Sequence, residues 1–282
     1  MYKKITSIFF LLLCDTALHI HVFAQANMLN HHTITVFIHG TSIARRMMNI
    51  SPFKPNVFCP QGLTLAKELP QEYRYYKIAQ SCADLNQKQY PLESFYIFGW
   101  RSESFNHRVR MKAAKNLMVS LQNVITEYYH KNKVIPFVRL IGFSHGGNVV
   151  LNSAHFAPLM INEKPVAVEA WLVATPIQRV NHDLVNHEHF KKVYSIYSKK
   201  DWLQRIDPQG IFNKKVRKTH FWSDRTFDQG AQCIQVKFTV NSKSISHTSY
   251  RPLFQYFPSI QDLIEQAAQD LDFGMIEVDF TL

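Results

Sequence analysis

The sequence is poor in the residues that build several classes of protein. Its 282 residues include only 4 Cys, 9 Gly and 12 Pro, and 19% of them are charged. Four Cys are too few for a disulfide-dense scaffold. Such low Gly and Pro contents exclude a collagen-like or low-complexity chain. The length suits one large domain or two small ones.

Apolar and basic residues are what the sequence has in quantity. Hydrophobic residues make up 46% of the chain, and 21 Phe and 12 Tyr indicate a well-filled core. The 32 Lys and Arg outnumber the 21 Asp and Glu, for a formal net charge of +11, which favours anionic surfaces without naming one. No nucleic-acid partner is expected, because the sequence contains no recognised DNA- or RNA-binding module.

The first 26 residues have the pattern of a signal peptide. Lys3 and Lys4 precede an apolar run of ten residues from Ile5 to Cys14, and small residues at 22–24 and 24–26 offer two cleavage sites. The run is shorter than the roughly 20 residues that span a bilayer. We therefore expect a secreted or periplasmic protein with a single domain over residues 27–282. An uncleaved N-terminal membrane anchor is the alternative.

Continuous β-rich runs alternate with stretches of helical periodicity. Most of the runs are apolar on both faces, as expected for central strands of a parallel sheet covered by helices on each side. The expected strands are Thr33–Ile38, Phe95–Phe98, Phe137–Ile141, Val166–Val173, Val193–Tyr197 and Ile234–Val240. The expected helices include Arg108–Tyr129, Asn148–Phe156 and, closing the chain, Ile260–Leu271. This alternation predicts an α/β fold, doubly wound, with a mostly parallel sheet of about six strands and helices on both faces.

One pentapeptide carries most of the functional signal. Residues 142–146, Gly-Phe-Ser-His-Gly, follow the third expected strand and match G-x-S-x-G, the sharp strand-to-helix turn known as the nucleophile elbow. The turn pushes the hydroxyl of Ser144 outward in a strained backbone conformation. Side chains at Gly142 and Gly146 would collide there, so both positions need glycine.

A second motif, His39-Gly40-Thr41, ends the first expected strand. Acyl transfer needs preorganised donors for a developing oxyanion. The backbone N–H groups of Thr41 and His145 are the expected donors, and Gly40 lets the backbone approach closely.

With these two motifs the chain resembles the α/β-hydrolase superfamily, particularly its lipase- and esterase-like members. The resemblance covers most of residues 33–255 and extends to Phe95–Trp100 and Ala174–Pro176, which look like family strand ends that line the pocket. It implies a triad in the chain order Ser, acid, His, and chemistry without a metal or organic cofactor.

Candidates for the acid and the base lie downstream of the serine. Asp201 comes just after a strand, where the family's acid belongs, with Asp207 and Asp224 as competitors. His247 follows the last expected strand, whereas its rival, His220, precedes that strand. We expect Asp201 to orient the imidazole of His247, which exchanges the proton of the nucleophile.

These residues predict a serine hydrolase that cleaves carboxylic esters through an acyl-enzyme. The substrate would be a small-molecule ester or an acyl or lipid ester. A thioesterase or an acyltransferase would use the same residues. The alternative from another class is a non-catalytic module of the same fold that binds anionic lipid or polysaccharide.

Two polar segments leave their roles open. Residues 191–218 hold nine Lys or Arg and two Asp among several aromatic residues, which fits either a contact surface for anionic lipid or polysaccharide or an ordinary solvated face. Residues 181–189 contain three His and two acids, but no His pair has the i, i+4 spacing of a helical metal site. A solvated polar segment is the expectation for the second.

An exported chain would retain Cys59, Cys82 and Cys233. Three thiols cannot all pair within one molecule. One disulfide with a free thiol and three reduced thiols are both compatible with the sequence.

Overall fold

The computed structural model describes residues 32–41, 54–103, 106–212, 217–228 and 230–282. The expected signal peptide lies outside these residues, as does most of the segment between residues 41 and 60 that follows the first strand.

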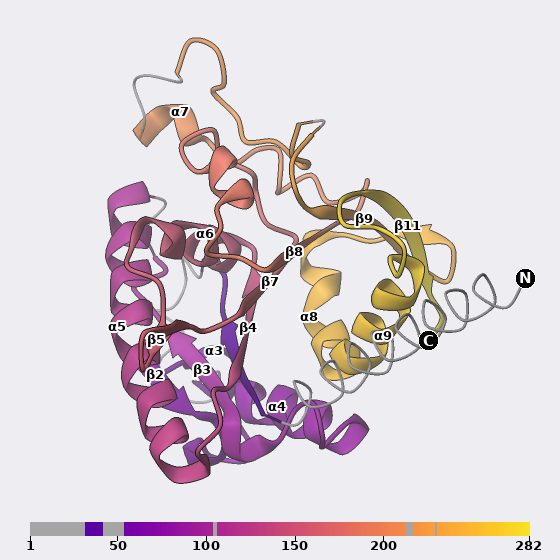
Figure 1. Cartoon of the computed structure of the whole chain (residues 1–282). Coiled ribbons are helices and arrows are strands. Elements are labelled where there is room, and N and C mark those ends of the chain that lie inside the picture. The colour runs from indigo at the N-terminus through magenta and orange to yellow at the C-terminus, as the bar shows by residue number, and fades with distance from the viewer. Residues whose placement is uncertain (1–31, 42–53, 104–105, 213–216, 229) are drawn as a thin grey trace, which may run out of the picture.

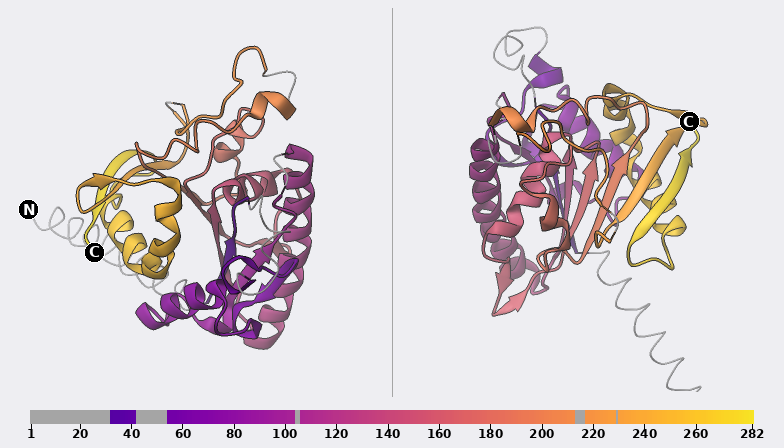
Figure 2. Two further views of the ribbon diagram at one scale, coloured as in Figure 1. Left: turned by 180° about the vertical axis from the view of Figure 1, so that it is seen from behind. Right: turned by 90° about the horizontal axis from the view of Figure 1, so that it is seen from above.

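A nine-stranded sheet runs through the molecule (Figures 1 and 2). Its order is β10-β9-β8-β7-β4-β1-β3-β2, with β11 paired to β9. Only β2 and β10 run antiparallel to their neighbours, and the other pairs are parallel. The strands are β1 (Thr33–Ile38), β2 (Gly62–Leu65), β3 (Phe95–Gly99), β4 (Phe137–Phe143), β7 (Val168–Val173), β8 (Lys192–Tyr197), β9 (Ile234–Val240), β10 (Lys243–Ser244) and β11 (Gly274–Phe280). A separate small hairpin joins β5 (Met160–Ile161) to β6 (Lys164–Pro165).

The central strands are buried on both faces because helices cover both. All residues of β1 and β7 are buried. In β1, Ile34, Val36 and Ile38 enter one apolar cluster, and Phe37 enters the cluster on the opposite face. This alternation explains why the strand reads as a continuous apolar run in the sequence.

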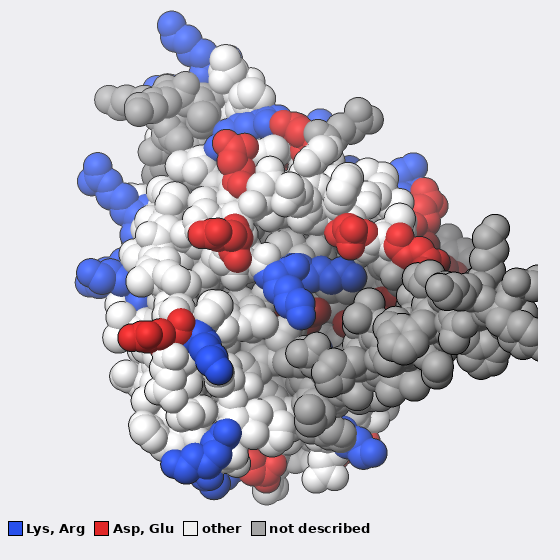
Figure 3. Space-filling model, viewed as in Figure 1, with Lys and Arg blue, Asp and Glu red and all other residues white. Residues whose placement is uncertain are grey.

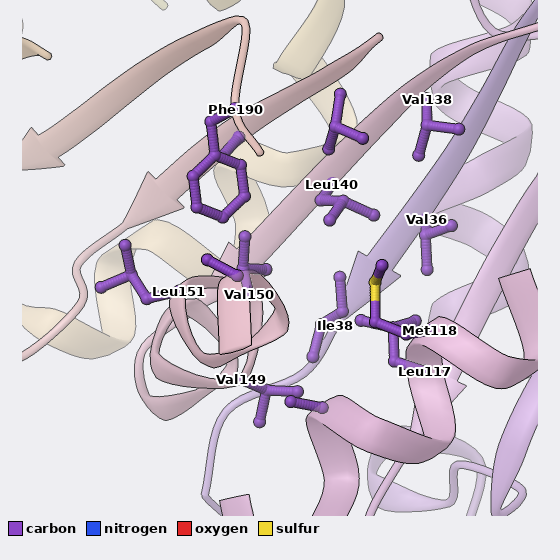
Figure 4. Close-up of a cluster of buried hydrophobic side chains, with 14 of the residues drawn as sticks. Val36, Ile38, Leu117, Met118, Val138, Leu140, Val149, Val150, Leu151 and Phe190 are labelled. Carbon is purple, nitrogen blue, oxygen red and sulfur yellow. The ribbon is translucent and has the colours of Figure 1, made fainter. Parts of the chain in front are cut away.

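The first face is covered by α5 (His107–Asn132) and α6 (His145–Asn152). Figure 4 shows Leu117 and Met118 of α5 beside side chains of α6 and of the sheet. The side chain of Asn106 caps α5 by accepting a hydrogen bond from the backbone N–H of Arg108, and the helix ends where Lys133 adopts φ 57°.

The opposite face is covered by α4 (Arg74–Leu85), α8 (Tyr250–Leu253) and α9 (Phe257–Ala267). Figure 2 shows these helices and the pair α5–α6 on opposite sides of the sheet. The remaining short helices are α3 (Lys54–Val57), α7 (Gln209–Phe212) and the 3-10 turns η1 (Ala66–Glu68), η2 (Leu92–Ser94), η3 (Ser153–His155), η4 (His182–Asn186), η5 (His247–Ser249) and η6 (Phe254–Tyr256).

The predicted fold class is confirmed: the sheet is mostly parallel and has helices on both faces. All six expected strands are present as β1, β3, β4, β7, β8 and β9. The expectation that a helix closes the chain was wrong, because α9 ends at Ala267 and β11 follows it. The expected helix over 148–156 begins earlier, at His145, and ends at Asn152.

Candidate active site

Ser144 occupies a sharp turn between β4 and α6. Its backbone has φ 54° and ψ −128°, a conformation that non-glycine residues rarely adopt. Two hydrogen bonds hold the turn: Ser144 N–H donates to the Val173 carbonyl at 2.8 Å, and Gly147 N–H donates to the Ser144 carbonyl at 3.0 Å. The strain is therefore held in place by the adjacent strand β7 and by the first turn of the helix.

Close backbone contacts explain the glycines around this turn. A Cβ at position 146 would collide with the Ile38 carbonyl oxygen, and one at position 142 would collide with the backbone of Gly147. A Cβ at Gly40 would lie 2.7 Å from the Cβ of Ser144. The end of β1 and the serine turn thus pack together without space for a methyl group.

The structure brings Ser144, His247 and Asp201 into one hydrogen-bonded line. Nε2 of His247 lies 3.0 Å from Oγ of Ser144, and Nδ1 lies 2.8 Å from Oδ2 of Asp201. Ser144 and Asp201 follow the carboxyl ends of the parallel strands β4 and β8, and His247 follows the two-residue strand β10, which pairs with the carboxyl end of β9. This arrangement lets the imidazole accept a proton from the hydroxyl while Asp201 accepts a hydrogen bond from Nδ1–H.

Packing and further hydrogen bonds fix the acid and the imidazole. Asp201 is fully buried, its Oδ1 accepts a 3.3 Å hydrogen bond from the Gln204 backbone N–H, and its carbonyl accepts one of 3.0 Å from Arg225 Nη2. The ring of Phe143 stacks on that of His247 with the centroids 5.1 Å apart. These contacts limit the rotation of both side chains.

The competing candidates have other partners. Asp224 pairs with Arg179 at 3.4 Å and forms an isolated β-bridge with Ile177. Asp207 bonds to His145. His220 makes no hydrogen bond to Asp201 within the described part of the chain, where that carboxylate is held by His247 instead.

Asp207 belongs to a buried polar network directly behind the serine, which the sequence reasoning missed. Nε2 of His145 lies 3.1 Å from Oδ1 of Asp207, and Nε2 of Gln178 donates to Oδ2 at 2.5 Å. Arg110 Nη2 donates to Gln178 Oε1 at 2.6 Å. On the other side of the His145 ring, Nδ2 of Asn148 lies 3.3 Å from Nδ1. The only early signal for this network was the presence of a second acid beyond the same strand.

The network assigns charges to its members. Burial lowers the pKa of His145, and the neighbouring Arg110 lowers it further. Burial alone would raise the pKa of Asp207, but the hydrogen bonds from His145 and Gln178 and the charge of Arg110 lower it. We therefore assign an ionised Asp207 and a neutral His145 whose Nε2–H donates to Asp207 and whose Nδ1 accepts from Asn148.

The two expected oxyanion donors lie on either side of the serine. Thr41 directly follows Gly40, which contacts Ser144. His145 opens α6, and the first turn of a helix has no intrahelical acceptors for its N–H groups. The Thr41 hydroxyl is buried and has no hydrogen-bond partner within the described residues.

The sheet order, the strained serine turn after a central strand, and the chain order of Ser144, Asp201 and His247 together define the architecture. The chain has an α/β-hydrolase fold.

Comparisons with known proteins find likeness in structure alone. No family model matches the sequence, and no curated protein matches it. Among solved structures, XC6422 from Xanthomonas campestris, described as an α/β serine hydrolase without a lid, is similar with 13% identity over 84% of this chain and 81% of that chain, and a TM-score of 0.35. TT1662 from Thermus thermophilus has 11% identity over 84% and 90% of the two chains and a TM-score of 0.40. A hyperthermophilic esterase from Pyrobaculum calidifontis has 11% identity over 89% and 68% and a TM-score of 0.34.

The other polar clusters are engaged in structural contacts. His182 Nε2 accepts a 3.2 Å hydrogen bond from the Asp228 backbone N–H, and His189 Nε2 lies 3.2 Å from Ser153 Oγ. Among the described residues, no group of three or more His, Cys, Asp or Glu is arranged to hold a metal ion.

None of the described helices combines the length and the apolar character that a membrane span needs. Cys59, Cys82 and Cys233 are buried, and none of them forms a disulfide within the described residues.

Proposed function

We propose that the protein is a serine hydrolase that cleaves carboxylic esters, with Ser144 as nucleophile, His247 as general base and acid, and Asp201 as the orienting carboxylate. The observation that carries this proposal is the line of hydrogen bonds from Ser144 Oγ through His247 to Asp201, at 3.0 and 2.8 Å. A hydroxyl held in a strained turn and bonded to an imidazole, itself bonded to a buried carboxylate, fits nucleophilic catalysis.

The reaction would proceed in two halves. His247 Nε2 accepts the Ser144 proton as the oxygen attacks the ester carbonyl, and the backbone N–H groups of Thr41 and His145 stabilise the oxyanion. His247 then donates the proton to the departing alcohol, which leaves an acyl group on Ser144. In the second half His247 accepts a proton from water, the water attacks the acyl group, and the carboxylic acid is released. Asp201 stays ionised throughout and stabilises the imidazolium.

An acyl or lipid ester is the proposed substrate class. Thioester hydrolysis and acyl transfer to a second alcohol would use the same groups, because they differ only in the leaving group or in the acceptor. Adding a primary alcohol during ester hydrolysis separates transfer from hydrolysis: a transferase forms the new ester in preference to the free acid.

Labelling with a fluorophosphonate tests the proposal. We expect the wild type to be labelled and Ser144→Ala to remain unlabelled although it is folded. The same pair of proteins should differ in hydrolysis of p-nitrophenyl esters, and a series of acyl-chain lengths then defines the preferred substrate. No labelling of the folded wild type, or equal labelling of the variant, would favour the non-catalytic binding module.

Export is a further part of the proposal, and it is supported by the composition of residues 1–26. N-terminal sequencing of the protein from its natural host tests it. A mature chain that begins after Ala24 or Ala26 supports cleavage, whereas a retained Met1 in a membrane fraction supports the uncleaved anchor.

A further inference from the structure

In the segment 201–211, polar side chains are buried and apolar side chains are exposed. Four of its polar residues are buried: Asp201, Gln204, Asp207 and Gln209. Between them, four apolar residues are exposed: Trp202, Leu203, Ile206 and Ile211. Trp202 and Ile211 each expose 58% of their surface. A surface loop in contact with water alone has the opposite preference, because burying apolar surface is favourable.

Hydrogen bonds join this segment to residues 221–223 and form one layer with it. Gly210 N–H donates to the Phe221 carbonyl at 2.9 Å, Gln209 Nε2 donates to the Trp222 carbonyl at 2.6 Å, and Ser223 N–H donates to the Asp207 carbonyl at 3.0 Å. Trp222, in the segment 221–223, is 52% exposed. We call the exposed side chains of Trp202, Leu203, Ile206, Ile211 and Trp222 the apolar patch.

The buried polar residues attach this layer to the body of the protein. Gln204 Nε2 donates to the Thr175 carbonyl at 3.0 Å, Arg179 N–H donates to Gln209 Oε1 at 2.9 Å, and Asp207 holds His145. Each of these inward-pointing polar side chains forms a hydrogen bond with the body of the protein. The apolar patch is therefore held outward by the inward hydrogen bonds.

The exposed charged residues of the two segments that carry the apolar patch, 199–211 and 217–223, are all basic. Asp201 and Asp207 are buried, and Asp224 pairs with Arg179. The exposed basic residues of the same region are Lys199, Lys200, Arg205, Arg217 and Lys218. In the space-filling view, basic side chains project from the end of the molecule where α7 lies (Figure 3). Apolar side chains in a basic surround complement a surface that is both apolar and anionic.

We propose that the apolar patch and its basic surround dock the protein onto an anionic lipid surface. Indole rings suit the boundary between lipid and water, since one part of the ring is apolar and its N–H is polar. Lys and Arg add attraction to anionic headgroups, which salt weakens. Because Trp202 directly follows Asp201, docking would bring the lipid to the edge of the sheet that carries Ser144, which gives the proposed hydrolase access to esters in that surface.

Tryptophan fluorescence can detect the docking directly. The chain has 4 Trp, and Trp100 and Trp171 are buried at 2% and 0% exposure, so a change on binding reports on Trp202 and Trp222. Vesicles of phosphatidylcholine alone are compared with vesicles that also contain phosphatidylglycerol. We expect a blue shift and quenching by brominated acyl chains with the anionic vesicles, both reversed by high salt. No change with either vesicle, or an equal change with both, overturns the proposal.

Two pairs of variants test the residues while keeping both reporter tryptophans. Ile206→Ser with Ile211→Ser removes apolar area, and its control is Val119→Ser on α5, where Val119 is also 58% exposed. Lys200→Gln with Arg205→Gln removes charge, and its control is Lys131→Gln with Lys133→Gln. We expect each test pair to weaken vesicle affinity about tenfold or more and its control to leave it unchanged. Equal effects of test and control variants contradict the proposal.

Activity on a soluble short-chain ester separates docking from catalysis. The docking variants should keep fluorophosphonate labelling and short-ester hydrolysis while losing hydrolysis of esters in anionic vesicles. Vesicle binding by a protein that resists labelling supports docking and defeats the proposed hydrolase. Labelling without vesicle binding defeats docking alone and leaves a soluble polysaccharide or a protein as the partner of the apolar patch.

Discussion

His145 and Asp207 form a buried pair immediately behind the proposed nucleophile, with Nε2 and Oδ1 3.1 Å apart. His145 is covalently next to Ser144, and Asp207 lies in the layer that carries the apolar patch. The pair therefore connects the serine turn to the surface proposed for docking. It also holds the first residue of α6, whose backbone N–H is a proposed oxyanion donor.

Asp207→Asn should reduce turnover without abolishing it. The variant keeps the shape of the side chain but removes its negative charge. That charge balances Arg110, and the carboxylate that carries it accepts hydrogen bonds from His145 and Gln178. Without it, His145 and its backbone N–H can shift. We expect kcat to fall about tenfold to a hundredfold with little change in KM, as for an interaction used mainly in the transition state. Steady-state hydrolysis of a soluble ester measures both constants.

The free energy of unfolding should depend on pH because Asp207 is ionised in the folded protein. The pKa of Asp207 is lowered in the folded protein, so its ionised form stabilises the fold above the unfolded-state pKa near 3.8, and this contribution is lost as the pH falls through the lower folded-state pKa. Denaturant unfolding should thus show a deficit for Asp207→Asn that is large at neutral pH and small in acid. Asp224→Asn, at a more exposed acid, is the matched control. An equal deficit at both pH values would refute the assignment of an ionised Asp207.

Asp201→Asn tests the proposed acid of the triad. Asparagine can hold His247 with the wrong nitrogen protonated, which leaves Nε2 unable to accept the Ser144 proton. By analogy with serine hydrolases, we expect kcat to fall about 10³- to 10⁴-fold. Rates of ester hydrolysis and of fluorophosphonate labelling measure the effect, with Asp224→Asn expected to stay within about twofold of wild type. A similar loss of activity in Asp201→Asn and Asp224→Asn would contradict the proposed role of Asp201 as the orienting acid.

The central strands were predictable because their signal is local. The residues of β1 and β9 match the expected ranges, since each strand is a continuous run of β-favouring side chains. The sequence did not predict β11, which is an edge strand with alternating burial. Its Met275 is 57% exposed, and its first residue, Gly274, has φ 135°. The sequence did not predict β2 either, because the four residues of β2 are only half-buried. Their pairing depends on neighbours far away in the chain, which no local pattern encodes.

For the site, the sequence could indicate which residues follow the strands but not how their side chains pair. Asp201 and Asp207 both lie beyond β8, and only the structure separates the one that meets His247 from the one that meets His145. The inverted burial of residues 201–211 was equally hidden, because the composition of that segment alone resembles an ordinary basic loop.

Gly146→Ala should disrupt the serine turn. The added methyl group would collide with the backbone carbonyl of Ile38, which cannot move without displacing β1. We expect a loss of about 2–4 kcal/mol in the free energy of unfolding, together with loss of activity in whatever fraction folds. Gly62→Ala is the comparison: Gly62 has φ 86° but open space around it, so only backbone strain of about 1 kcal/mol is expected. Denaturant unfolding of the two variants would refute the packing argument if their costs were equal.

Glu265 on α9 should make the protein less stable as the pH rises. Burial raises the pKa of Glu265 to about 7, and Glu169 adds to the effect while Arg139 opposes it. Because the folded-state pKa lies above the unfolded-state value of 4.5, the folded protein prefers the protonated acid. The cost of ionising it is absent below pH 4.5, grows between pH 4.5 and 7, and is complete above that range.

Glu265→Gln resembles the protonated acid and keeps an oxygen to accept the 2.7 Å hydrogen bond from Gln261 Nε2. At pH 8 we expect the variant to be more stable than the wild type by about 3 kcal/mol, from about 1.4 kcal/mol per unit of pKa. At pH 4 the two proteins should have equal stability. Glu93→Gln, on the short turn η2, serves as the control and should show no such pH dependence. Denaturant unfolding across this pH range provides the measurement, and a gain from Glu265→Gln that persists unchanged in acid would show that the carboxyl is not the source of the penalty.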